Sequence, residues 1–150
     1  MSTAETQTVE KTAEPEKPTV AIKDINGQTI AQLEGESLET TSYYRKQLAG
    51  ADFKAIQFAE GTTFYCSNLS NANFANANLK RANLQVCNLQ GANLSGTDLR
   101  LANLIDADLR NADLSGSSFE FSRAWGAKYN QQTKFPKGIV PSKCRMVWVD

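Results

Sequence analysis

Histidine is absent from the 150-residue sequence, which removes the commonest acid–base catalyst and metal ligand. Cys66, Cys87 and Cys144 form neither a paired framework nor a zinc-ligand spacing. No apolar run approaches the roughly 20 residues of a membrane-spanning helix, and the N-terminus lacks the basic-then-apolar pattern of a secretion signal. Sixteen Lys and Arg balance sixteen Asp and Glu. These absences argue against a membrane protein, a disulfide-stapled secreted domain, a His-dependent enzyme and a strongly basic nucleic-acid-binding protein.

The N-terminal third of the chain consists of two segments of different composition, residues 1–18 and residues 19–50. Residues 1–18 carry almost no large apolar side chain and are expected to be a disordered tail, because they cannot bury enough surface to offset the entropy of ordering. Within residues 19–50, Asn26-Gly27 separates two apolar stretches, which predicts a β-hairpin closed by a type I′ turn. Residues 34–50 fit a short helix and a degenerate form of the following repeat equally well.

A strict period of five residues occupies the middle of the chain. Every fifth residue from 64 to 119 is Leu or Phe, the residue two positions earlier is small, and the residue one position earlier is Asn or Asp in ten of twelve repeats. The pattern continues weakly to Tyr129 and extends back to Phe53 and Phe58, offset by one extra residue near Gly61. The twelve large residues, expected to form the structural core, are Phe64, Leu69, Phe74, Leu79, Leu84, Leu89, Leu94, Leu99, Leu104, Leu109, Leu114 and Phe119.

This period suits neither common element. Five residues advance about 500° around an α-helix, so successive large residues would wind over its whole surface. On a flat strand an odd step would place them on alternating faces. A chain that turns a corner every five residues keeps the large and small residues inside, and four sides close a square coil of 20 residues. Stacked coils then pair like parallel strands and supply each other's core.

The units Ala-Asn-Leu-Lys-Arg at 77–81 and Ala-Asp-Leu-Arg-Asn at 107–111 resemble the pentapeptide-repeat protein family. The resemblance implies an all-β fold, a right-handed quadrilateral β-helix of about four coils over residues 51–130, with the hairpin capping the first coil. It indicates little about activity, because the motif residues are structural. We expect the Asn and Asp side chains to bond to the backbone at the corners, in preference to forming a ligand or cation site. The family includes quinolone-resistance proteins that imitate DNA on a topoisomerase, and the resemblance also allows regulation by binding a transcription factor.

Charge argues against imitation of DNA. Residues 51–125 would form a stack about 19 Å long, and B-DNA of that length presents roughly 11 negative charges. The segment holds seven acidic and six basic residues, a net charge of −1. A DNA-mimicking protector or inhibitor of DNA gyrase is therefore the disfavoured alternative.

Large apolar residues occupy positions that the square coil turns outward, and a contiguous exposed apolar patch typically marks an interface. Two explanations stay open. The favoured one is that residues 131–150, with their apolar Ile139, Val140 and 146–149, fold back over the patch; the other is a partner-binding surface. The candidate partner-binding residues, called the apolar patch below, are Tyr65, Val86, Leu101, Ile105, Phe121 and Trp125.

The C-terminal segment is basic, since residues 126–150 carry five Lys and Arg against Asp150 alone. A solvated basic segment is favoured over one that meets an acidic partner or a membrane surface. We expect residues 131–150 to cap the last coil or to join two copies of the chain.

No nucleophile–base pair, Gly-rich phosphate loop or carboxylate dyad is apparent, so we expect no enzymatic activity, no cofactor and no metal. Cys87 takes an inward small position and Cys66 points outward, which argues against a bridge between them. The sequence predicts a non-catalytic, cytoplasmic interaction or scaffold protein that acts through an unidentified protein partner, with a homodimer also considered. DNA binding and a transmembrane segment are not expected.

Overall fold

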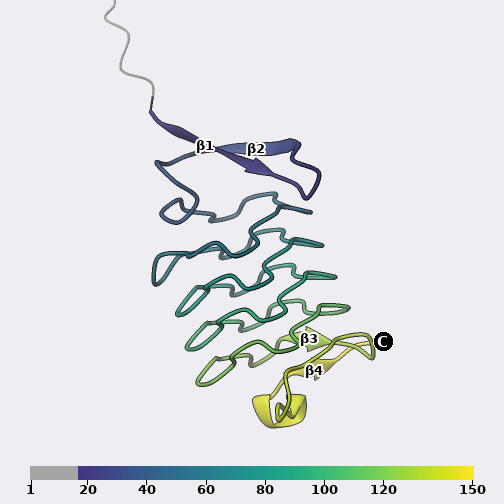
Figure 1. Ribbon diagram of the computed structural model, residues 1–150. Coiled ribbons are helices and arrows are strands. Elements are labelled where there is room, and N and C mark those ends of the chain that lie inside the picture. The colour runs from purple at the N-terminus through teal and green to yellow at the C-terminus, as the bar shows by residue number, and fades with distance from the viewer. Residues whose placement is uncertain (1–16) are drawn as a thin grey trace, which may run out of the picture.

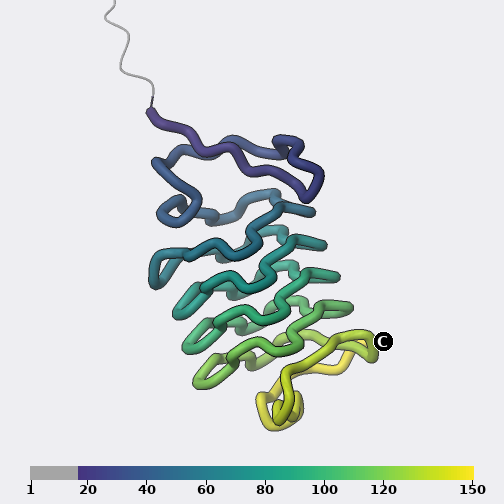
Figure 2. The backbone as a smooth tube through the Cα atoms, in the orientation of Figure 1, coloured from purple at the N-terminus to yellow at the C-terminus, as the bar shows by residue number. Residues whose placement is uncertain are grey.

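The computed structural model describes residues 17–150, so the tail expected over residues 1–18 lies outside the described residues except for its last two positions. The backbone winds into a stack of square coils, with a hairpin at one end and the C-terminal segment at the other (Figures 1 and 2). The only helix among the described residues is the short 3₁₀ helix η1 (Pro141–Cys144). Within this range no helix has the length and hydrophobicity needed to cross a membrane.

The expected hairpin is present and caps the first coil. Strands β1 (Thr19–Lys23) and β2 (Thr29–Glu34) pair antiparallel, with one irregularity in register next to Lys23. The side chains of Ile22 and Leu33 are buried and join the core. The N–H of Asp52 donates to the carbonyl of Lys23 at 2.7 Å, which ties the hairpin to the stack. The open end of the stack is therefore covered.

The predicted type I′ turn is wrong. That turn needs positive φ at both central residues, yet only Gly27 has it, at +80°. Instead, Oδ1 of Asp24 accepts hydrogen bonds from the N–H groups of Asn26 and Gln28, each at 2.9 Å. The N–H of Gly27 also donates to the Asp24 carbonyl at 3.0 Å. This carboxylate organises a longer loop, because an Asp side chain can replace a backbone acceptor in a turn.

The coils stack in a register of 20 residues. Asn68 pairs with Asn88 in parallel, as Thr63 does with Asn83. Before Gly61 the spacing is 21, as in the pairing of residues 52 and 73, which confirms the extra residue expected there. A second extra residue lies between 128 and 134, since 113 pairs with 134 rather than 133. The sequence analysis missed this second insertion.

The inward assignment of the repeat is confirmed. All twelve large residues from 64 to 119 are at most 6% exposed, and the small residues two positions before them are buried as well. The stack begins earlier than expected, because Tyr43 and Leu48 are also fully buried. The second half of residues 34–50 is therefore the degenerate repeat and not a helix. Phe53, Phe58, Phe64, Phe74 and Tyr43 form an aromatic cluster inside the first coils.

At each corner that follows a large residue from 64 to 119, the chain makes a β-turn in which the residue two positions after the large one has positive φ. At one corner the N–H of Ala72 donates to the carbonyl of Leu69 at 3.1 Å, and Asn71 between them has φ of +56°. The Asn or Asp before the large residue also bonds to the turn: Oδ1 of Asn73 accepts from the N–H of Ala75 at 3.2 Å. The expected structural role of this Asn/Asp column is confirmed.

The C-terminal segment extends the stack. Strand β4 (Val147–Trp148), which follows η1, pairs in parallel with β3 (Lys128–Tyr129). The N–H of Val147 donates to the carbonyl of Ala127 at 2.9 Å, and the side chain of Met146 is buried. The segment therefore caps the last coil (Figure 1).

The favoured expectation that residues 131–150 cover the apolar patch is wrong. Val86, Leu101, Phe121 and Trp125 remain 44%, 42%, 84% and 62% exposed. The reason is that the last coil presents unpaired backbone groups along the stack axis. The C-terminal backbone satisfies them there and leaves these four side chains exposed.

Candidate interaction surface

The exposed apolar residues form two columns on neighbouring corners of the stack. In the first column, the N–H of Leu101 donates to the carbonyl of Glu120 at 3.1 Å, so Leu101 lies beside Phe121 on the next coil. Phe121 is the most exposed large hydrophobic residue described, at 84%. A phenylalanine this exposed has no packing role in the folded chain.

The second column lies around the following corner. The N–H of Val86 donates to the carbonyl of Ile105, and the N–H of Asp106 donates to the carbonyl of Trp125, each at 3.0 Å. Val86 and Trp125 are exposed, whereas Ile105 is half-buried between them. One side of the coil, which includes Arg123, separates this column from Phe121. The structure thus places five of the six predicted residues along the two corners that bound one face of the stack.

Tyr65 lies apart from the other five. Gln85 stands between it and Ile105, because the N–H of Cys66 bonds to the Gln85 carbonyl. Tyr65 stacks instead on Tyr44, with ring centroids 5.7 Å apart and planes 9° apart. The sequence analysis missed Tyr44, although the 21-residue spacing imposed by the extra residue near Gly61 places it beneath Tyr65.

Three patch residues occupy corners that disfavour them. Val86, Leu101 and Phe121 have φ of +60°, +62° and +58°. This left-handed conformation costs an L-residue with a Cβ about 1–2 kcal/mol, and β-branched residues are the least tolerant of it. The equivalent position is Gly or Asn at many other corners, as at 71, 76, 91, 96, 111 and 116. Large apolar side chains at these three corners therefore do not serve the fold.

A shallow groove of about 340 Å³ adjoins the second column. Ile105, Ala124 and Trp125 provide its apolar lining, and residues 143–145 with Arg123 provide its rim. Cys144 in this rim is a half-buried free thiol. The groove is thus bounded by the last coils on one side and by η1 and the chain after it on the other.

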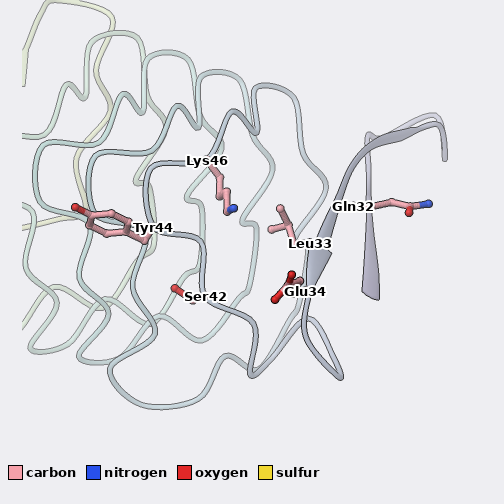
Figure 3. Close-up of a pocket in the computed structure, with 6 residues that line it drawn as sticks. All are labelled: Gln32, Leu33, Glu34, Ser42, Tyr44 and Lys46. Atoms are coloured by element: carbon pink, nitrogen blue, oxygen red, sulfur yellow. The ribbon is translucent and has the colours of Figure 1, made fainter. Parts of the chain in front are cut away.

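A second cavity, of about 460 Å³, lies between β2 and the first coil (Figure 3). Its lining includes Glu34, Ser42 and Lys46, and Figure 3 shows Gln32 on the side of the hairpin away from the coil. The carboxylate of Glu34 pairs with Lys17 at 3.2 Å. Among the described residues, no hydrogen bond joins the side chains of Ser42, Lys46 and Glu34.

A family model described as pentapeptide repeats matches eight copies, over residues 59–85, 67–104 and 82–120. The chain is 33% identical to a pentapeptide repeat protein from the thylakoid lumen of Arabidopsis thaliana, covering 59% of this chain and 68% of that one, with a TM-score of 0.35. The chain belongs to the pentapeptide repeat family. Proteins of this family form right-handed quadrilateral β-helices, so the expected family and fold class are confirmed.

Two further solved structures are similar to the chain. A Nostoc PCC 7120 protein, alr5209, is 25% identical over 72% of this chain and 84% of its own length, with a TM-score of 0.43. QnrB1, a plasmid-mediated fluoroquinolone resistance protein, is 15% identical over 78% of this chain and 67% of its own, with a TM-score of 0.39. No curated protein matches. Pentapeptide repeat proteins are generally non-catalytic scaffolds, whereas a cytoplasmic location stays a prediction.

Ion pairs neutralise four of the seven acidic residues of residues 51–125 in this pentapeptide repeat stack. Glu60 contacts Lys80 at 2.8 Å and Arg81 at 3.1 Å, and Asp98 contacts Arg100 at 2.6 Å. The hydrogen bond from Arg100 lowers the pKa of the Asp98 carboxyl, so this ion pair persists in mildly acidic solution. Further pairs join 108 to 110 and 113 to 134. The surface therefore lacks the continuous negative charge of a DNA backbone.

The cysteines do not form a reactive cluster. Cys87 is buried in an inward position, and burial raises the pKa of its thiol to about 12. Cys66 occupies the corner position equivalent to Val86 on the preceding coil and is half-buried with φ of +59°. No three His, Cys, Asp or Glu residues of the described chain are arranged to hold a metal ion.

Proposed function

We propose that this pentapeptide repeat protein is a rigid interaction scaffold that binds a protein partner through the apolar patch. The observation that carries the proposal is the 84% exposure of Phe121 at a corner with positive φ. Such a residue lowers stability and solubility without contributing to the core. A burial site on a partner would account for it.

The shape of the stack suits this role. Exposed aromatic side chains that become buried in an interface supply much of its binding energy. Leu101, Phe121 and Trp125 sit on corners whose backbone is hydrogen-bonded to the adjacent coil. Little backbone ordering is therefore needed on association, which favours affinity.

A capture experiment tests the proposal. The full-length protein and the Leu101→Asn/Phe121→Asn variant are immobilised and exposed to extract of the native host. Asn tolerates positive φ, so the variant should fold. We expect a protein retained by the wild type to be lost from the variant. The matched control is Ile25→Asn, which removes an equally exposed apolar residue from the hairpin loop.

If every retained protein binds the double variant as well as the wild type, the patch is not the binding surface and the proposal fails. Inhibition of gyrase supercoiling by micromolar protein would favour the DNA-mimicking alternative instead. We expect no inhibition, because residues 51–125 have a net charge of only −1 and most of their acids are ion-paired.

A further inference from the structure

We propose that the groove beside Trp125 binds an extended acidic peptide segment of the partner. One large apolar side chain of the peptide packs on Ile105 and Trp125, and flanking carboxylates pair with Arg123, Lys143 and Arg145. The inference rests on the proposed function and adds the chemistry of the segment that the partner presents.

The three cations at the groove carry the charge argument. Arg123, Lys143 and Arg145 are exposed and line one groove. None of them forms an ion pair within residues 17–150. Elsewhere on the repeats, the cations at 80, 81, 100, 110 and 134 have carboxylate partners, whereas Lys54 and Lys128 stand singly without one in the described chain. The groove therefore gathers cations whose charge the rest of the described chain leaves uncompensated.

The apolar lining sets the second requirement. Trp125 is 62% exposed, and Ile105 beside it is half-buried. The groove volume of about 340 Å³ lies near the lower end of the ~300–1,000 Å³ range of ligand sites. It has room for a large side chain and the adjacent backbone, and it is open to solvent. This shape suits an extended segment better than an enclosed small molecule.

The rim is attached to the stack. The N–H of Gly126 donates to the carbonyl of Arg145 at 2.9 Å, and the N–H of Arg145 donates to Ser142 at 3.1 Å. Arg145 has φ of +55° as the residue that ends η1. These bonds hold the backbone of the rim against the coil that carries Trp125, so the cations and the apolar lining are presented together.

A peptide fits this groove better than a nucleic acid. Aromatic and basic residues together also bind single-stranded nucleic acid, but such sites follow the backbone over many phosphates. Here the basic footprint is three residues, and the carboxylate of Asp106 lies against Gly126 at its edge. Glu120 precedes Phe121 at the neighbouring corner. These acids would repel a continuous polyphosphate, whereas a peptide can place its carboxylates only where the cations are.

The test uses Trp125 as its own reporter. The chain has two tryptophans, so Trp148→Phe in the full-length protein leaves Trp125 as the only source of tryptophan emission. The probe is a short peptide with one phenylalanine flanked on both sides by glutamates. We expect saturable binding with a blue shift of Trp125 emission, and we expect binding to weaken as salt is raised.

Matched variants and peptides separate the two requirements. Arg123→Gln/Lys143→Gln should weaken binding about tenfold, as expected for the loss of two exposed charge pairs. Lys137→Gln, which removes an exposed cation outside the groove, should leave binding unchanged. A peptide with glutamine in place of glutamate, or with alanine in place of phenylalanine, should bind at least tenfold more weakly.

Several results would overturn the inference. One is that the glutamine peptide binds as tightly as the glutamate peptide. A second is that a thymidine oligonucleotide binds more tightly than the acidic peptide. A third is that the blue shift of Trp125 emission follows protein concentration and occurs without peptide, which would indicate self-association. Another is a red shift of Trp125 when the four glutamates of residues 1–16 are replaced with glutamine, which would assign the groove to the chain's own N-terminal segment. The two proposals can fail separately. If the acidic peptide does not bind but the Leu101→Asn/Phe121→Asn variant still loses the captured protein, the groove inference is refuted and the proposed function stands.

Discussion

Leu94 provides the sharpest test of the stack. It is fully buried, and its backbone is bonded to both neighbouring coils: the N–H of Leu94 donates to Asp113 and the N–H of Phe74 donates to Asn93, each at 2.7 Å. Its side chain therefore lies in a column between Phe74 and Leu114. A close-packed site held from both sides cannot collapse easily, so truncation leaves a cavity.

We expect Leu94→Ala to lower the free energy of unfolding by about 3–5 kcal/mol, the upper range for buried leucines. That is a large share of the ~5–15 kcal/mol typical of a domain. Leu94→Lys should abolish the cooperative transition, because it buries an unpaired ammonium where no described carboxylate reaches the interior. The assay is urea unfolding followed by far-ultraviolet circular dichroism.

The control is Ser118→Lys, which adds the same charge at an exposed position of the repeat and should change stability by less than about 0.5 kcal/mol. If Leu94→Lys unfolded at the same urea concentration as Ser118→Lys, Leu94 would not face the interior. The packing described for the whole repeat would then be refuted.

Two further predictions concern ionisable groups. Hydrogen bonds from Ser115 and Lys134 lower the pKa of Asp113 from 3.8 to about 2, so its ionised form stabilises the fold above pH 4, and this contribution disappears as the pH falls to 2. Asp113→Asn should therefore lower Tm by about 1–3 °C at pH 7 and by nothing measurable at pH 2; a constant difference would contradict this. Ellman's reagent should label Cys66 and Cys144 in the native protein and Cys87 only after unfolding, since only Cys87 is buried; labelling of all three in the native state would show that the stack opens.

The corner chemistry could be predicted only in part. The Asn or Asp before each large residue predicted side-chain bonds to the backbone, and Asn73 makes one. The sequence analysis did not identify the positive φ two positions later, because residues as different as Gly91, Asn71 and Val86 adopt it. In this fold the bond to the adjacent coil imposes that conformation, whatever its local cost.

The apolar patch shows the same division. The five-residue period predicted that its six residues face outward, and in the structure all but Tyr65 lie on the same face of the stack. Counting could not pair Tyr65 with Tyr44, since the 21-residue register of the first coil was not recognised as far back as Tyr43. Nor could it find the groove, whose rim comes from residues 143–145.

The sequence by itself determined the square coil, because a five-residue period leaves a chain one way to bury every large side chain together. It also determined near-neutral charge. Tertiary structure alone decided the path of residues 131–150. The apolar residues of this segment were compatible with two arrangements, a cover over the apolar patch or a cap on the last coil. The cap prevails because β3 presents unpaired backbone groups that β4 can satisfy, and an unsatisfied backbone group costs more than an exposed side chain.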